Sequence, residues 1–344
     1  MAVTDIGPSR AQRFAAAADR LGWIVLLLAI VMCSFVTIST IVAFIPVGRT
    51  FADWLTYVHA VERLLAGVPI YPAEQLSGPY VLPSATLIGY AYPPSSVPLF
   101  FPFSSYPVGL VAWLTLNVGL VITGLYAVLK LELGRVRPLE FAVVLFGLAF
   151  FRGFVEGVAF ANASVGLGGL FAWCWVIGRG RPTIGVLAGL GATFKLVPGT
   201  LVFWSTRATF LRVLFSAAAV GGALFVVTLP LVGIQSWFDY RTALSLSIPA
   251  CGADPPTSVA CGLQPFVGIG AAKLGGIVLA LVAGGLAVLA RRPLVSFALV
   301  AIAWLSPVTD LHYHYLLVVY VLAVVACATW LRRRRQAAPA SRSR

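Results

Sequence analysis

Charged residues are scarce in this sequence. Only 10% of its residues are Asp, Glu, Lys or Arg, whereas 60% are hydrophobic. A soluble domain carries about 25% charged residues. The composition therefore excludes a soluble fold and indicates an integral membrane protein. At about 20 apolar residues for each crossing, the length suits roughly eight to ten membrane-spanning helices.

Several catalytic motifs are also missing. The sequence has no phosphate-binding loop, no dinucleotide fingerprint, no nucleophile elbow and no HExxH motif. A nucleotide-consuming or hydrolytic enzyme therefore has no local support, and the energy for any reaction must arrive with the substrate. No Cys and His spacing resembles a zinc site. We expect neither a metal nor a cofactor.

The basic residues lie in short tracts between apolar segments. The chain has a net charge of +13, but its basic residues are not collected in one domain, so we expect no nucleic-acid partner. The tracts instead predict topology, because cytoplasmic segments are enriched in Lys and Arg. Arginines in residues 1–20 and the arginine run that opens residues 332–344 place both tails in the cytoplasm.

Residues 21–331 are predicted to form a single all-α polytopic membrane domain. Residues 183–204 lie between Arg181 and Arg207 and are interrupted near Lys195 and Pro198, which predicts a re-entrant or short-helix hairpin. About eight full spans complete the bundle, alternating outward and inward, at 21–45, 108–129, 139–151, 164–177, 210–232, 267–290, 294–307 and 315–331.

This topology places two long loops outside, at 46–107 and 233–266, and long loops usually have a function. The first contains an amphipathic helix that begins near Asp53 and ends at Gly67, which we expect to lie along the membrane interface. A jaw-like segment rich in proline and aromatic residues follows, too interrupted to span. All three histidines and most acidic residues also fall outside, so we expect the chemistry there.

Two cysteines share the second outer loop. Cys251 and Cys261 flank a short stretch that includes two prolines, in a compartment that is expected to be oxidising. A disulfide that pins this loop is the favoured interpretation.

Two charged residues are candidates for chemistry at the membrane. Asp53 is either a helix N-terminal acid that interacts with the helix dipole or a general base for an attacking hydroxyl. Lys195 is the basic residue deepest in an apolar stretch, so its ammonium either snorkels, pairs with a carboxylate or binds a phosphate.

Other ionisable residues cluster near the same face. Asp310, His312 and His314 follow a span within five positions, which indicates either a solvated turn or a substrate contact. Arg152 is one helical turn from Glu156, and the two side chains can pair. Asn162 is interpreted only as a polar interhelical contact.

Four segments in order resemble glycosyltransferase family 87. They are DWLTYVHAVERLLAGVPIYP, YAYPPSSVPLFFPFSSYP, GVLAGLGATFKLVPGTLVFW and LSPVTDLHYHY. The resemblance implies a GT-C fold and a polyprenyl-phosphate sugar donor, typically mannose. It gives Asp53 as the catalytic base, Lys195 as the basic position and His312 as the first histidine of the last motif.

We therefore expect an inverting hexosyltransferase in the plasma membrane that acts at its outer face. Its partners would be the polyprenyl-phosphate sugar, a glycolipid or glycan acceptor and membrane lipids. The expected substrate-binding residues are Tyr57, Tyr92, Arg152, Lys195, Asp310, His312 and His314. A lipid transporter or flippase, or an inactive member of the family, is the alternative.

Overall fold

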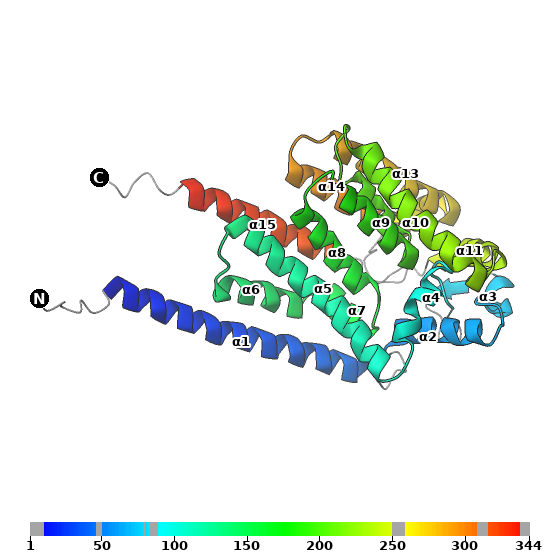
Figure 1. The fold of residues 1–344 in the computed structure, drawn as a ribbon, viewed down its shortest axis with the longest axis horizontal. Helices are drawn as coiled ribbons and strands as arrows, with labels where there is room; N and C mark the ends of the chain where they lie inside the picture. The colour runs from blue at the N-terminus through cyan, green and yellow to red at the C-terminus, as the bar shows by residue number, and fades with distance from the viewer. Residues whose placement is uncertain are drawn as a thin grey trace, which may run out of the picture.

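Helices form almost the whole of the computed structural model (Figure 1), which describes residues 10–45, 50–78, 80–82, 89–249, 259–307 and 316–337. The first half holds α1 (Arg10–Phe44), α2 (Ala52–Leu65), α3 (Ala73–Leu76), α4 (Ser96–Phe100), η1 (Phe101–Phe103), α5 (Val108–Leu133), α6 (Pro138–Ala149), α7 (Arg152–Ala159) and α8 (Ser164–Ile177). The second half holds α9 (Pro182–Phe194), η2 (Val197–Phe203), α10 (Phe210–Val232), α11 (Gln235–Leu246), α12 (Val259–Val267), α13 (Ile269–Leu289), α14 (Pro293–Leu305) and α15 (Leu317–Ala337).

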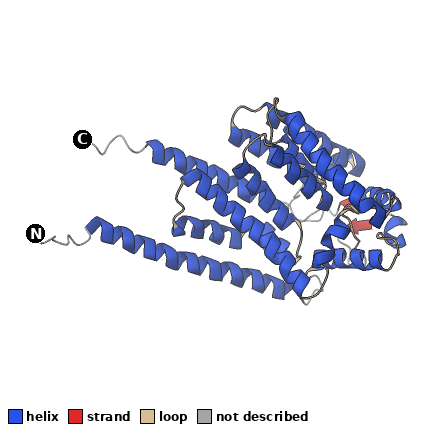
Figure 2. Ribbon diagram, viewed as in Figure 1, coloured by secondary structure: helices blue, strands red, loops and turns tan. Residues whose placement is uncertain are grey.

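A short pair of strands joins the two segments predicted as outer loops. Strand β1 (Tyr80–Leu82) pairs in parallel with β2 (Ser247–Pro249), with Val81 in register with Ile248 (Figure 2). The two segments therefore form one cap, although about 165 residues separate the strands along the chain.

Among the residues that the structure describes, four helices are long and apolar enough to cross a membrane. These stretches are Arg20–Ala43, Val108–Leu133, Phe210–Val232 and Gly270–Leu289. The bent pair α6 and α7, with 65° between its helices, gives a fifth if it is counted as one span. The structure therefore supports a multi-pass helical protein. Helices α8, α9 and α14 are apolar but shorter, at 13 or 14 residues, or about 20 Å each against a hydrocarbon core of about 30 Å.

The break predicted near Lys195 and Pro198 is present. Helix α9 ends at Phe194, Lys195 has extended backbone angles, and η2 continues the chain as a 3₁₀ helix with Pro198 in its first turn. Glycines let α9 lie close to α10: a Cβ on Gly185 would come within 2.1 Å of the Val213 carbonyl oxygen. Residues 182–204 therefore form two short helices, of which α9 packs against α10 and η2 against α14.

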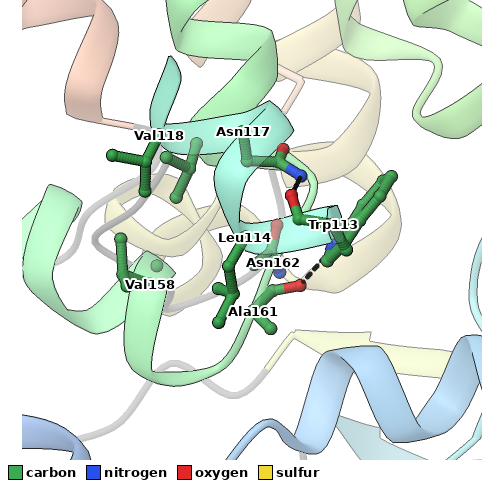
Figure 3. Close-up of a pocket in the computed structure, with 9 residues that line it drawn as sticks. Trp113, Leu114, Asn117, Val118, Val158, Ala161 and Asn162 are labelled. Atoms are coloured by element: carbon green, nitrogen blue, oxygen red, sulfur yellow. Dashed lines mark hydrogen bonds between the residues drawn. The ribbon is translucent and has the colours of Figure 1, made fainter. Parts of the chain in front are cut away.

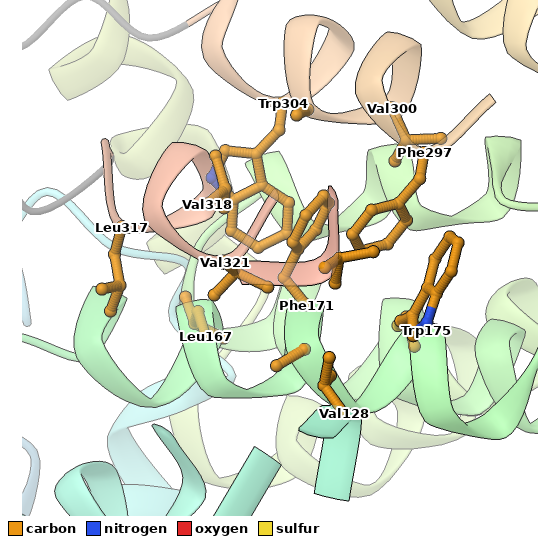
Figure 4. Packing of buried hydrophobic residues seen from close by; sticks show 14 of the residues in the cluster. Val128, Leu167, Phe171, Trp175, Phe297, Val300, Trp304, Leu317, Val318 and Val321 are labelled. Atoms are coloured by element: carbon orange, nitrogen blue, oxygen red, sulfur yellow. The ribbon is translucent and has the colours of Figure 1, made fainter. Parts of the chain in front are cut away.

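The main core lies among α5, α8, α14, α15 and the α9–η2 hairpin. Its centre is an aromatic stack in which the Phe171 and Phe297 rings lie 4.2 Å apart, with Trp175 and Trp304 at their edges (Figure 4). Glycines on α8 make this packing possible, because a Cβ on Gly169 would lie 2.5 Å from the Leu120 backbone of α5.

The elements divide between two ends of the molecule. The first turns of α1 and the last turns of α15 lie at one end, and α2, α3, α4 and α11 gather at the other (Figure 1). The amphipathic helix that was predicted to begin near Asp53 and end at Gly67 is α2, whose buried face carries Trp54, Tyr57 and Val61. This arrangement puts Asp53 at the end opposite to the chain termini.

Candidate functional site

Asp53 lies where the start of α2 meets the end of α7. The backbone N–H of Phe51 donates to the Ala159 carbonyl at 2.8 Å, and the N–H of Asp53 donates to the Phe160 carbonyl at 3.2 Å. The donors at a helix start thus meet the acceptors at a helix end. Phe51 adopts a left-handed conformation to make this turn. The docking fixes the backbone of Asp53 against the turn that follows α7.

Both oxygens of the half-buried Asp53 carboxylate have donors. The Asn162 side-chain amide donates to Oδ2 at 2.5 Å, and the Tyr92 hydroxyl lies 3.4 Å from Oδ1. A half-buried carboxylate with one oxygen only loosely bonded can accept a proton from a nearby hydroxyl.

Lys195 lies on the other side of Tyr92. Its ammonium nitrogen is 5.2 Å from the centre of the Tyr92 ring, a cation–π distance. The Lys195 side chain is buried, with 6% of it exposed, and the break between α9 and η2 brings it to this position. The structure therefore places a carboxylate near the Tyr92 hydroxyl and an ammonium group near the Tyr92 ring.

Tyr57 packs against the ring of Tyr92. It is fully buried, and its ring stacks on Tyr92 at 4.5 Å and on Phe100 at 4.7 Å. Trp113 packs against the same group at 6.0 Å. The structure thus brings together four of the residues predicted from the sequence: Asp53, Tyr57 and Lys195 lie around Tyr92.

A buried polar network holds the Tyr92 backbone. The Tyr71 hydroxyl donates to the Tyr92 carbonyl at 2.6 Å, and the Gln75 amide donates to the Tyr90 carbonyl at 2.9 Å. Burial raises the pKa of Tyr90 far above its usual value, although its contact with the Ser96 hydroxyl acts in the opposite direction. Tyr90 therefore stays neutral at physiological pH and fixes the loop before α4.

Asn162 is the site residue that sequence reasoning missed. It lies in the turn between α7 and α8 and lines a narrow gap between α5 and α7 that has no room for a water molecule (Figure 3). Trp113 donates to the Ala161 carbonyl at 2.8 Å in the same turn. A polar residue next to an apolar segment is a recognisable signal, but its partner on α2 is not visible in the local sequence.

Arg152 lies at the opposite end of α7 from Asn162. It pairs with Glu156 at 2.5 Å, as the sequence predicted, and most of its side chain is exposed. The eight residues of α7 span about 12 Å, so Arg152 is about one helix length from the turn that holds Asp53. Its role in substrate binding stays a prediction.

Several other predictions fall outside the described residues. Asp310, His312 and His314 lie in the undescribed segment 308–315, and Cys251 lies in 250–258. Cys261 is described only as part of the α12 backbone. The proposed disulfide and the last motif are therefore untested.

Comparison with known proteins places the chain in a family. Glycosyltransferase family 87 matches residues 90–292, more than half of the chain. The match includes Tyr92, Asn162 and Lys195, whereas Asp53 precedes it. No curated protein and no solved structure matches the chain. With its apolar helices and this match, the chain belongs to glycosyltransferase family 87, a family of membrane glycosyltransferases.

Proposed function

We propose that this glycosyltransferase takes a hexose, with mannose as the first choice, from a polyprenyl-phosphate donor. The acceptor would be a lipid-linked sugar or a glycan at the outer face of the membrane. One observation carries the proposal: the Asp53 carboxylate and the Lys195 ammonium both contact Tyr92. Such a pair suits a reaction that removes a proton at one atom and releases an anionic phosphate at another.

In the proposed reaction, Asp53 takes the proton from the acceptor hydroxyl. The acceptor oxygen then forms a bond to the anomeric carbon, and the bond from that carbon to the donor phosphate breaks with its electron pair leaving on the phosphate. Attack from the side opposite the leaving group inverts the anomeric configuration. The proton remains on Asp53, and polyprenyl phosphate carries the negative charge away.

Lys195 would stabilise that departing phosphate. Its ammonium is buried, and a cation in a site of low dielectric interacts strongly with developing negative charge. The scheme calls for no nucleotide, because the donor already carries a phosphate leaving group. It calls for no metal, because Lys195 and other cationic side chains can hold a phosphate.

The proposed topology keeps both termini in the cytoplasm and the Asp53 site outside the plasma membrane. Eight crossings and the α9–η2 hairpin give this parity. Two observations support it: arginines dominate the end where α1 begins and α15 ends, and the Asp53 cap lies at the opposite end (Figure 1).

The function is tested by sugar transfer with purified protein in lipid nanodiscs. Radiolabelled polyprenyl-phosphate mannose is the donor, and a membrane glycolipid extract supplies acceptors. We expect wild-type protein to transfer label and Asp53→Asn to be slower by about 10²–10⁴-fold, because general base catalysis typically contributes this much. Glu62→Gln is the matched control, since it makes the same change on the exposed face of α2 and should leave transfer unchanged.

Two results would contradict the proposal. Transfer by Asp53→Asn at the wild-type rate, with an unchanged melting temperature, would remove Asp53 as the base. Movement of the labelled lipid between leaflets by wild-type protein, without any transfer in the same preparation, would favour the transporter alternative.

A further inference from the structure

Asn162 makes the shortest contact to the Asp53 carboxylate. Its Nδ2 donates to Oδ2 at 2.5 Å, whereas the Tyr92 hydroxyl is 3.4 Å from Oδ1. Asn162 is almost completely buried, with 1% exposed. A buried amide that bonds a carboxylate in low dielectric is a strong restraint on the carboxylate's rotation.

A second hydrogen bond, to the oxygen of the Asn162 side chain, fixes the orientation of the amide. Its Oδ1 accepts the backbone N–H of Ser164 at 2.7 Å, at the start of α8. The oxygen must therefore face Ser164, and the amide nitrogen must face Asp53, to which one of its N–H groups donates. Asn162 thus satisfies one of the free donors at the α8 N-terminus while it holds Asp53.

The backbone around Asn162 is equally constrained. Ala161 adopts a left-handed conformation with φ of 52°, and its carbonyl accepts the Trp113 indole N–H. The N–H of Asn162 donates to the Gly157 carbonyl at 2.8 Å. A left-handed conformation is uncommon for alanine and persists only where the surroundings enforce it. The turn therefore presents the Asn162 amide in one position.

We propose that Asn162 is a positioning residue for the catalytic base, on the basis of the proposed function. It holds Oδ2 of Asp53, so that Oδ1 is the oxygen that takes the acceptor proton. The described groups that face this carboxylate are the Asn162 amide and the Tyr92 hydroxyl, with the Lys195 ammonium beyond the Tyr92 ring. Without Asn162, the carboxylate loses this donor and can rotate away from the acceptor hydroxyl.

The first test uses Asn162→Ser and Asn162→Asp in the nanodisc transfer assay. Serine can still accept the Ser164 N–H but is too short to reach Asp53, so we expect kcat to fall roughly 10–100-fold with little change in the donor KM. Aspartate has the same shape and places a second carboxylate against the first. The acidic limb of its pH–rate profile should move up by about 1–2 pH units, because two adjacent carboxylates retain a proton.

Asn117→Ser is the matched control. Asn117 is also a buried amide of the α5–α8 contact, and it bonds the Trp113 carbonyl and the Gly166 N–H instead of Asp53. We expect it to lower the melting temperature without shifting the pH profile. Unchanged kcat and pH profile in both Asn162 variants, with active wild-type protein, would overturn the proposal.

A double-mutant cycle tests the contact without any transfer activity. Asp53→Ala, Asn162→Ser and the double variant are compared by melting temperature in the same nanodiscs. If Asn162 holds Asp53, the double variant should lose less than the sum of the two single losses. Additive losses would overturn the proposal. Inactive wild-type protein with a coupled cycle would instead count against the proposed donor while keeping the Asn162 contact.

Discussion

At the scale of the single residue, Lys195 is the most unusual feature of the site. An ammonium buried in a membrane domain is unfavourable unless it has partners or a function. Its side chain is 6% exposed, and its ammonium lies 5.2 Å from the centre of the Tyr92 ring. The helix break at this position also frees backbone carbonyl groups from the α9 ladder, which favours a cation nearby.

Replacement of Lys195 should separate binding of the donor phosphate from stability. We expect Lys195→Met to lower kcat/KM for a polyprenyl-phosphate sugar by about 10²–10³-fold, the usual effect of losing a group that stabilises developing negative charge. Methionine keeps an unbranched chain of similar length, so melting temperatures measured alongside separate the loss of the phosphate contact from a loss of the fold.

Lys195→Arg serves as the charge-retaining control and should keep more activity than Lys195→Met, even though Arg is bulkier. We would compare the two variants with wild type by steady-state kinetics over a range of donor concentrations, and measure melting temperatures on the same preparations. Equal activity in Lys195→Met and wild type would show that the ammonium does not contact the leaving phosphate.

The difference between Asp53 and Asn162 shows how far sequence reasoning reaches at this scale. Asp53 follows an apolar span and begins an amphipathic helix, so a local pattern marks it. Lys195 interrupts an apolar stretch and is marked in the same way. Asn162 gains its role only from a hydrogen bond to a residue 109 positions away, which exists because α2 docks on α7. No local pattern encodes that docking.

At the scale of the element, proline and glycine were the most reliable guides. Pro198 after Lys195 predicted the α9–η2 break. The sequence did not reveal that segment 139–151 is the first arm of a bent pair with 65° between its helices. Such a bend depends on how α1 packs on α6 and α7, and hydropathy along the chain does not contain that information.

The arginines near the end of α15 form ion pairs with other helices, in addition to the topological role predicted for them. Arg332 pairs at 3.1 Å with Glu132 of α5, and Glu132 is buried with 3% of its side chain exposed. Trp175 donates to the other Glu132 oxygen at 2.9 Å. Arg335 pairs with Glu140 of α6. These contacts attach α15 to two other helices at the end where it carries its charges.

Loss of Arg332 should therefore destabilise the bundle. In Arg332→Gln, a buried Glu132 oxygen loses its cation, and we expect a loss of about 1–3 kcal/mol in the free energy of unfolding. Arg333→Gln removes the same charge from an exposed neighbour and should change stability little. Thermal unfolding in nanodiscs compares the two. Equal melting temperatures would show that the Arg332 pair adds nothing beyond net charge.

At the scale of the whole molecule, the cap and the termini lie at opposite ends of the helical bundle (Figure 1). The β1–β2 pair holds the two cap segments together. The Asp53 site lies at the same end of the molecule, where α2 meets α7. The sequence predicted the two long segments and their common side. It could not predict that they pair, because strand pairing over such a separation depends on the assembled bundle.

The arrangement of the ends makes the proposed topology testable with two cysteines. In a background where the five native cysteines are replaced by alanine, His59→Cys introduces a thiol on the exposed face of α2, beside the site, and Arg333→Cys introduces one on the exposed end of α15. A membrane-impermeant maleimide added to intact cells should label the first. It should label the second only after permeabilisation, because positively charged segments remain in the cytoplasm.

The reverse pattern would place the Asp53 carboxylate in the cytoplasm, where the acceptor and the sugar donor would have to be available from the inner leaflet. Labelling of both thiols in intact cells would instead mean that an even number of crossings separates the two positions, and the α9–η2 hairpin would then have to be reassigned as a full span.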